Sequence, residues 1–221
     1  VPLLPFLYVH GGYKDVWDKK DPTLPHTFGY YMREALDKGW IPMHPKEDRT
    51  PKVYIVSGGN PLRRWPMPQI AKKHLWPKLD LVVTVDFRMS TTAMHSDYVL
   101  PAAAYYEKIG IHQGAYLPYI IACDKAHEPL GESKAEWEIY GRLAKRISER
   151  AKARGIGPVR GFHDQPLDLT GVYDRYTDHG RYDPVGDPND DMKLMDIICN
   201  SPKTVTVKSG REALDMGAVP M

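Results

Sequence analysis

Three short runs of β-branched and aromatic residues stand out in the first half of the chain, each bounded by polar or turn-forming residues. They cover residues 52–56 (KVYIV), 79–85 (LDLVVTV) and 97–101 (DYVLP). The first of these runs predicts a buried strand, and the other two predict further strands. A segment with helical spacing at 68–75 separates the first two runs, and a short turn separates the last two. Strands joined by helical crossovers are typical of a parallel sheet.

We therefore expect an α/β fold, in which a parallel-sheet, Rossmann-like lobe over residues 51–154 carries helices on both faces and long loops rich in Pro and Gly. Residues 1–50 precede this lobe as a loop-rich segment with one helix over 27–38. Residues 155–221 follow it as an irregular excursion, rich in Gly, Pro and Asp, with short helices near the end of the chain.

The clearest helix is predicted near the end of the main lobe. Ser133 and Glu136 have the spacing of a capping box, and Gly155 is a helix stop. A second capping box, Ser209 with Glu212, predicts a short helix close to the end of the sequence. The apolar stripe of the first helix, which we expect to face the sheet, consists of Trp137, Tyr140, Leu143, Ala144 and Ile147.

Composition and charge exclude several classes of function. Hydrophobic residues make up 42% of the chain and charged residues 26%, which suits a globular protein with a sizeable core. The net charge of +2 comes from interleaved basic and acidic residues, so no nucleic-acid-binding surface is expected. No apolar run approaches the roughly 20 residues that a membrane-spanning helix needs.

Motifs for a metal site or for nucleophilic catalysis are absent from the sequence. Cys123 and Cys199 lack C-x-x-C spacing, which excludes a local zinc or iron–sulfur site, and spacing alone leaves open whether they form a disulfide. The nine histidines contain no pair at i,i+4 and no H-E-x-x-H motif. Without a G-x-S-x-G motif or a catalytic cysteine setting, the catalytic residues stay unknown.

Glycine and polar residues follow the predicted strands, at the edge where open parallel sheets bind ligands. After the first strand come Gly58, Gly59, Asn60 and Pro61, in which the glycines let a ligand approach the backbone and the amide offers a donor and an acceptor. Asp86 ends the second strand, where dinucleotide folds place a carboxylate that binds a ribose. A tight turn and a helix cap are the alternative explanations of these two signals.

Hydroxyl and basic side chains lie near the same strand ends. Thr91 and Thr92 either cap the next turn or contact a phosphate. Arg63 and Arg64 either meet a phosphate or form surface ion pairs. Because neither G-x-G-x-x-G nor the P-loop motif is present, an ordinary NAD or P-loop site is disfavoured. Together the strand ends favour a nucleotide-like ligand.

The order of these motifs resembles a known family. YIVSGGNPLRR, LWPKLDLVVTVDFRMSTTAMHSDYVLPAAAYYEKIGI and EPLGESKAEWEIYGRLAKRI, within about residues 50–150, are similar to molybdopterin oxidoreductases of the dimethyl sulfoxide reductase type. The most specific part starts at Asp86, where D-x-R-x-S-x-T-A, S-D-x-V-L-P-A-A and Y-E-K follow in order. This part most resembles the branch of ethylbenzene, dimethyl sulfide and steroid dehydrogenases, close to the selenate and nitrate reductases.

The resemblance implies a cofactor and a set of residues that hold it. Members of the family carry molybdenum on two pyranopterins, as molybdenum bis(molybdopterin guanine dinucleotide), and residues 51–154 resemble the second of their two cofactor-binding lobes. Asp86 would accept hydrogen bonds from the guanosine, and Lys108 would pair with phosphates or a carbonyl. Glu136 matches a position where some members have Asp, although it also serves the predicted capping box. The residues expected at the cofactor are Gly58, Gly59, Asn60, Pro61, Asp86, Arg88, Thr91, Thr92, Lys108 and Glu136.

The resemblance also implies an activity and partners. The expected chemistry is two-electron transfer at molybdenum with oxygen-atom transfer or hydroxylation, on a substrate that the sequence does not reveal. An iron–sulfur cluster is expected elsewhere in the full subunit, and an iron–sulfur electron-transfer subunit is expected as a partner. Whether a haem b subunit is a further partner is left open. The expected location is the periplasm.

The family's cysteine motif, first lobe and terminal barrel have no counterpart in the sequence, which starts at Val1 without Met. We therefore expect a fragment of a larger catalytic subunit, inactive alone and without a molybdenum ligand of its own. The alternative is a stand-alone, non-catalytic guanine-nucleotide-binding module.

Overall fold

The computed structural model describes residues 14–18, 22–41, 50–113, 119–161, 165–187, 190–199, 207 and 209–220. The chain divides into two compact units, one of Val1–Tyr54 with His74–Asp80 and one of Ile55–Lys73 with Leu81–Met221. The segment boundaries expected from the sequence stay predictions. Among the described residues, no helix has the length and apolar character needed to cross a membrane.

The first unit contains the helices α2 (Lys14–Trp17) and α3 (Phe28–Asp37). α3 agrees with the helix predicted over 27–38. The Thr27 hydroxyl accepts a hydrogen bond from a backbone N–H in the first turn, and Gly39, with a φ of 68°, follows the last turn.

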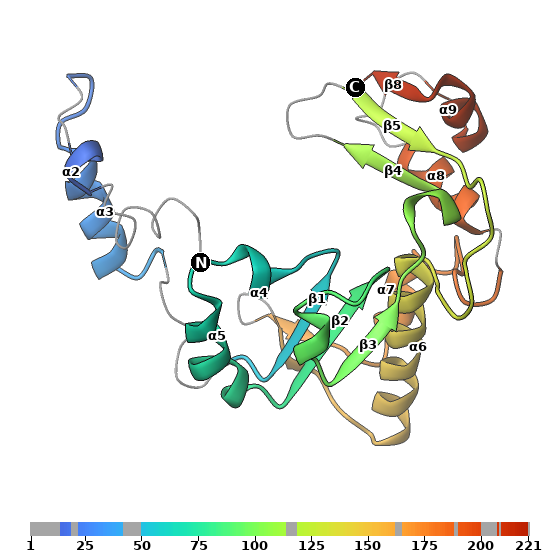
Figure 1. The fold of residues 1–221 in the computed structure, drawn as a ribbon, viewed down its shortest axis with the longest axis horizontal. Helices are drawn as coiled ribbons and strands as arrows, with labels where there is room; N and C mark the ends of the chain where they lie inside the picture. Colours follow the sequence, from blue (N-terminus) through green and yellow to red (C-terminus); the bar gives the residue numbers. More distant parts are fainter. Residues whose placement is uncertain are drawn as a thin grey trace. The chain divides into compact units, whose positions relative to one another are not determined.

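A three-stranded sheet forms the centre of the main lobe, with the order β1 (Val53–Ser57), β2 (Leu81–Asp86) and β3 (Tyr98–Pro101), as Figure 1 shows. β2 and β3 are parallel. The N–H of Gly58 donates to the carbonyl of Val85 at 3.2 Å, so β1 and β2 end at the same edge. The prediction of an α/β fold with parallel strands is confirmed.

Short helical segments connect these strands. α4 (Pro61–Arg64), α5 (Pro68–His74) and the 3-10 helix η2 (Trp76–Lys78) lie between β1 and β2, and the 3-10 helix η3 (Ala93–His95) lies between β2 and β3. α5 agrees with the helix predicted over 68–75.

Only the central strand is buried along most of its length. β2 buries Val82, Thr84 and Val85, whereas Val53 of β1 and Tyr98 of β3 are exposed. The buried strand predicted at KVYIV is therefore correct only in part: Val56 of β1 is buried, whereas Val53 and Ile55 are exposed. β1 is an edge strand of this sheet and pairs with a single neighbour in it. The expected cover of helices on both faces stays a prediction.

The helix predicted at Ser133 begins three residues later. α6 spans Glu136–Ala153, and its N-cap residue, Ala135, makes no side-chain hydrogen bond. The Ser133 hydroxyl instead donates to a carbonyl three residues earlier, at 2.6 Å, and the Glu136 carboxylate forms an ion pair with Lys108. The predicted capping box is wrong, because a turn engages the serine and a distant lysine engages the glutamate.

Small residues form the buried face of α6, so the predicted stripe of large side chains is wrong in part. Gly141, Ala144, Ser148 and Ala151 are buried, while Leu143 is 44% exposed. The helix α7 (Val172–Tyr176) packs beside α6 (Figure 1), and the N–H of Tyr173 donates to the Ser148 hydroxyl at 2.9 Å. The segment that follows residue 155 thus contributes a helix to the packing of the main lobe.

A second sheet has no counterpart among the predicted elements. It is antiparallel, with the order β4 (Gly110–Gln113), β5 (Tyr119–Cys123) and β8 (Ala218–Pro220). Two helices near the end of the chain, α8 (Asp190–Cys199) and α9 (Gly210–Met216), agree with the short helices expected there, the second of them from its capping box. Sheet and helices share a small core of Ile120, Ala122, Met195, Val207 and Ala213.

Smaller features complete the second unit. The Ser209 hydroxyl accepts a hydrogen bond from the N–H of Glu212 at 3.2 Å, which confirms the second predicted cap. Cys123 carries a free thiol, and the side chain of Cys199 lies outside the described residues. β6 (Val159–Arg160) and β7 (Pro166–Leu167) form a short antiparallel pair.

Gly141 offers a test of the α6–α7 packing. A Cβ at this position would lie 3.3 Å from Cε1 of Tyr176, in α7, and 2.9 Å from Cγ of Pro184, which follows α7 in the chain. We expect Gly141→Leu to lower the free energy of unfolding by about 1–3 kcal/mol through overpacking. The control Ala153→Leu, at the exposed end of the same helix, should change it by less than about 0.5 kcal/mol. Equal values for both variants in urea unfolding would contradict this packing.

A second test concerns the pH dependence of stability. The Tyr173 hydroxyl donates to Asp183 and, with the N–H groups of Val185 and Gly186, holds the pKa of that carboxyl below its usual 3.8. Because the folded-state pKa is lowered, the stabilisation is present above 3.8 and is lost as the pH falls through the folded value.

We expect Tyr173→Phe to cost about 1 kcal/mol of unfolding free energy at neutral pH and progressively less in acid. Tyr98→Phe, an exposed control, should show no pH-dependent difference from the unchanged protein. The measurement is urea unfolding of both variants over a series of pH values. If the loss of unfolding free energy in Tyr173→Phe stays constant down to strongly acidic pH, the proposed hydrogen bond to ionised Asp183 is refuted.

Candidate functional site

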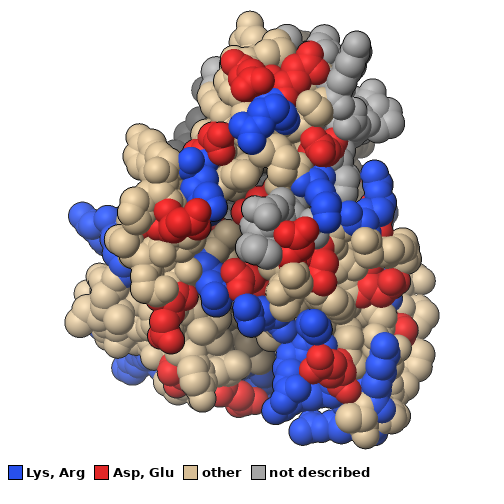
Figure 2. Space-filling view, turned by 90° about the vertical axis from the view of Figure 1, so that its right-hand side faces the viewer, with Lys and Arg blue, Asp and Glu red and all other residues tan. Residues whose placement is uncertain are grey.

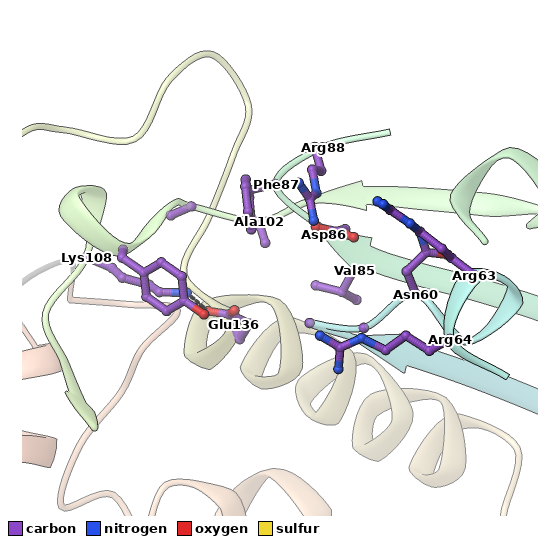
Figure 3. A pocket seen from close by; sticks show the side chains of 14 residues that line it. Asn60, Arg63, Arg64, Val85, Asp86, Phe87, Arg88, Ala102, Lys108 and Glu136 are labelled. Atoms are coloured by element: carbon purple, nitrogen blue, oxygen red, sulfur yellow. Dashed lines mark hydrogen bonds and ion pairs between the residues drawn. The ribbon is translucent and has the colours of Figure 1, made fainter. Parts of the chain in front are cut away.

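The loops that follow β1, β2 and β3 border an open pocket of about 340 Å³ at the carboxyl edge of the sheet (Figure 3). Most of the residues predicted at the cofactor line it, namely Gly58, Gly59, Asn60, Asp86, Arg88, Lys108 and Glu136. Four cationic and two acidic side chains contribute to its wall. The loops at the strand ends therefore border one pocket, and its role as a cofactor site stays a prediction.

The two glycines after β1 allow a sharp turn of the backbone and leave space beside it for a ligand. Gly58 has a φ of 62°, in the left-handed region that favours glycine, as the chain turns from β1 toward α4. A Cβ on Gly59 would come no closer than 3.9 Å to Val56 and to the Ser57 carbonyl, so the space next to this glycine belongs to the pocket.

Asn60 is fixed by Thr92, which follows β2 in the chain. The Asn60 Oδ1 accepts hydrogen bonds from the backbone N of Thr92 at 3.2 Å and from its hydroxyl at 2.8 Å. Because a backbone N–H requires an acceptor oxygen, the amide orientation is determined, and Asn60 lines the pocket. The NH₂ group of this amide has no hydrogen-bond partner among the described residues and can donate to a ligand.

Thr92 is fully buried and also accepts a hydrogen bond from the N–H of Leu62 at 3.1 Å. It therefore acts through Asn60 and α4 and does not line the pocket itself. Thr91 and Pro61 do not line the pocket either; Thr91 is exposed, and Pro61 is the first residue of α4.

Asp86 is the last residue of β2 and is only 8% exposed, yet it lines the pocket. Figure 3 shows its carboxylate at the pocket wall. Its backbone carbonyl accepts from the N–H of Ala102, whereas its carboxylate has no hydrogen bond or ion pair with any described residue. A buried carboxylate is costly unless donors meet it, so this group is suited to N–H or O–H donors of a ligand.

Lys108 and Glu136 form an ion pair at the opposite wall (Figure 3). The Lys108 side chain is 15% exposed and lies 5.8 Å from the ring centre of Tyr105. Since Glu136 takes no part in a capping box, the reason for doubting its place in the site is removed. The charges of the two side chains, however, are already paired with each other.

Arg63 and Arg64, for which the sequence left two explanations open, both line the pocket from α4. No ion pair or side-chain hydrogen bond joins either of them to a described residue, so the surface-ion-pair explanation does not apply within that part of the chain. Phe87 and Tyr105 add aromatic walls that were not predicted, although aromatic residues beside Asp86 and Lys108 are visible in the sequence.

Charge elsewhere on the surface is mixed. On the face drawn in Figure 2, Lys and Arg side chains are interspersed with Asp and Glu side chains. Among the described residues, no group of three or more His, Cys, Asp and Glu side chains is arranged to hold a metal ion. The features that point to a ligand are thus concentrated in the pocket at the sheet edge.

The fold is of the α/β class, with a pocket at the carboxyl edge of its parallel strands. Residues 37–146 match the family model described as molybdopterin oxidoreductase. The chain belongs to this family. This agrees with the resemblance found in the motifs from Asp86 onward.

Curated relatives support the assignment. The chain is 40% identical over 183 residues to the respiratory nitrate reductase subunit alpha of Haloferax mediterranei, an alignment covering 80% of this chain and 18% of that protein. It is 34% identical over 188 residues to the perchlorate reductase subunit alpha of Dechloromonas aromatica, covering 82% and 19%. It is 33% identical over 150 residues to the dimethylsulfide dehydrogenase subunit alpha of Rhodovulum sulfidophilum, covering 66% and 16%.

A solved structure has a similar fold. Acetylene hydratase from Pelobacter acetylenicus matches with a TM-score of 0.51 and 20% identity, over 76% of this chain and 18% of that chain. The chain spans less than a fifth of the length of these relatives.

Thr92 provides a test of how the site is held together. We expect Thr92→Val, which keeps the side-chain shape, to cost about 2 kcal/mol of unfolding free energy, because it leaves the buried N–H of Leu62 unpaired and removes a bond to Asn60. The neighbouring Thr91→Val replaces an exposed hydroxyl and should change stability by less than about 0.5 kcal/mol. Similar values for the two variants in chemical denaturation would show that the network does not support the site.

Proposed function

We propose that this domain binds the pterin cofactor of a molybdenum-dependent oxidoreductase, and that its pocket holds the guanosine end of a molybdopterin guanine dinucleotide. The observation that carries the proposal is the Asp86 carboxylate, which is buried, faces the pocket and has no partner among the described residues. Its position at the carboxyl edge of β2 is where open α/β sheets bind nucleotides.

The chemistry of the wall suits this ligand. A guanine base and a ribose both present N–H or O–H donors, and an ionised carboxylate only accepts hydrogen bonds. The NH₂ group of Asn60 offers the complementary donor to a carbonyl or phosphate oxygen. The Gly58 and Gly59 turn leaves its backbone open to close approach, and the Phe87 and Tyr105 rings border the same pocket.

Within such an enzyme, this domain binds and orients the cofactor. When bound, the cofactor supplies two-electron redox chemistry at molybdenum, with oxygen-atom transfer or hydroxylation. The pocket contributes a hydrogen-bond acceptor in Asp86, a fixed donor in Asn60 and positive charge from the arginines. No step of the reaction is assigned to a residue of this chain.

The names of the relatives support the wider proposal. They are alpha subunits of a nitrate reductase, a perchlorate reductase and a dimethylsulfide dehydrogenase, which favours a role as part of a catalytic subunit of a multi-subunit enzyme. The family resemblance supports a second cofactor lobe, an iron–sulfur cluster elsewhere in that subunit, an iron–sulfur electron-transfer partner and a periplasmic location as further parts of the proposal.

Asp86→Asn tests the proposed function in the full-length protein. The substitution keeps the shape of the side chain but replaces an acceptor oxygen by a donor, so we expect cofactor affinity to fall roughly tenfold to a hundredfold. Molybdenum and pterin content per folded chain should fall accordingly, while circular dichroism remains unchanged. Metal analysis and fluorescence of the released pterin measure the two contents.

The matched control is Asp80→Asn, since Asp80 precedes the same strand at its opposite end and is exposed. It should retain the full cofactor content. Wild-type molybdenum and pterin content in Asp86→Asn would refute the assignment of this pocket.

A further inference from the structure

Four cations line the pocket, and their surroundings differ. Lys108 is paired with Glu136, and Arg88 lies over the ring of Phe87. Arg63 and Arg64 have no ion pair, side-chain hydrogen bond or ring contact with any described residue. The family resemblance assigns the anionic part of the ligand to Lys108. The structure points to a different assignment.

We propose that Arg63 and Arg64, and not Lys108, form the anion-binding element of the pocket and give it a preference for a nucleoside diphosphate over the bare nucleoside. This inference rests on the proposed function, because it concerns the same pocket and names which of its cations binds the phosphates of the ligand.

The position of the two arginines is fixed by the backbone. The N–H groups of Arg63 and Arg64 both donate to the carbonyl of Asn60, at 3.1 and 3.0 Å. Leu62, between Asn60 and the arginines, is buried and bonds to the hydroxyl of Thr92. Although α4 has only four residues, it is therefore anchored on both sides of the turn.

The arginine side chains extend from this anchored turn. Both residues are exposed, and both line the pocket, with the guanidinium of Arg64 reaching across it in Figure 3. A guanidinium presents several N–H donors in a planar fork, which fits two oxygens of a phosphate at once. Because these forks are not used by carboxylates of the described residues, they are available to an anion.

Lys108 is in a different state. Its ammonium group is mostly buried between Glu136 and the ring of Tyr105. To bind a phosphate it would have to leave Glu136, and this partly buried carboxylate would then lose its cation and face the incoming negative charge. The pair is therefore better suited to form a neutral wall than to attract an anion.

Arg88, the fourth cation, lies 5.4 Å from the ring centre of Phe87. The two unpaired arginines of α4 and the buried carboxylate of Asp86 thus line one pocket. The arginines favour an anion, and the carboxylate favours hydrogen-bond donors. A nucleoside diphosphate carries both groups in one molecule.

The experiment measures the affinities of cofactor-free, full-length protein for guanosine 5′-diphosphate and for guanosine by titration calorimetry. We expect Arg63→Gln/Arg64→Gln to weaken diphosphate binding about tenfold or more and guanosine binding much less, so that the preference for the diphosphate falls by about tenfold. Arg63→Lys/Arg64→Lys keeps the positive charge but lacks the planar fork of donors. Its preference for the diphosphate should lie between those of the unchanged protein and the glutamine variant.

Two matched variants complete the experiment. Arg150→Gln/Arg154→Gln removes the same charge from exposed positions near the end of α6, outside the pocket, and should keep the wild-type preference. Lys108→Met/Glu136→Gln removes the ion pair and should change the two affinities by the same factor, which leaves the preference unchanged. Thermal unfolding confirms that every variant is folded.

The outcomes separate this inference from the proposed function. If the preference survives in the α4 double variant, another cation of the pocket binds the anion and the inference is wrong. If the preference falls in the Lys108/Glu136 variant, Lys108 takes part in anion binding and the inference is also wrong. If the unchanged protein binds guanosine without preferring the diphosphate, the inference alone is wrong. If it binds neither probe and Asp86→Asn keeps its cofactor, both the inference and the proposed function are wrong.

Discussion

The hydrogen bonds between the Asn60 amide and Thr92 fix how the first two strand-end loops face each other. Thr92 is fully buried, so these bonds are made away from water, where a lost partner is costly. They orient the NH₂ group of Asn60 and, through the N–H of Leu62, hold α4 in place. The positions of Arg63 and Arg64 depend on the same contact, because both arginines bond to the Asn60 carbonyl.

The two carboxylates of the pocket illustrate how surroundings give similar groups different roles. Glu136 has a cation beside it and completes the wall, whereas Asp86 is buried without a partner among the described residues. The free energy needed to keep an unpaired carboxylate out of water is offset only when donors meet it. Asp86 is therefore the group through which ligand binding and the stability of the strand end are most directly coupled.

Patterns that are local in the sequence predicted their structures well. The glycines after β1 and the aspartate that ends β2 were found because a strand end is recognisable from a few neighbouring residues. The capping box predicted at Ser133 and Glu136 was wrong for the opposite reason. Lys108, 28 positions away in the sequence, forms an ion pair with the Glu136 carboxylate that the local motif assigned to a cap. The antiparallel sheet was missed because β5 pairs with β8 from the far end of the chain, and neither strand has a long run of its own. For Arg63 and Arg64, the sequence left open whether the side chains bind a phosphate or form surface ion pairs. Possible carboxylate partners are far away in the sequence, so local patterns do not show whether they lie nearby in the fold.

The arginines and Asp86 differ in their exposure to water, which affects how a ligand is recognised. The arginines are exposed, so their attraction for an anion reaches into solution and is weakened by salt, over a screening length of roughly 10 Å at moderate ionic strength. Asp86 is buried, so its hydrogen bonds act only after the ligand has entered and are much less sensitive to salt. Under the proposed assignment, the arginines govern capture of the anionic part, and Asp86 discriminates among the groups attached to it. Arg63 and Arg64 lie on the α4 turn after β1, and Asp86 lies at the end of β2. The geometry of these two loops therefore sets the distance between the anion-binding groups and the carboxylate.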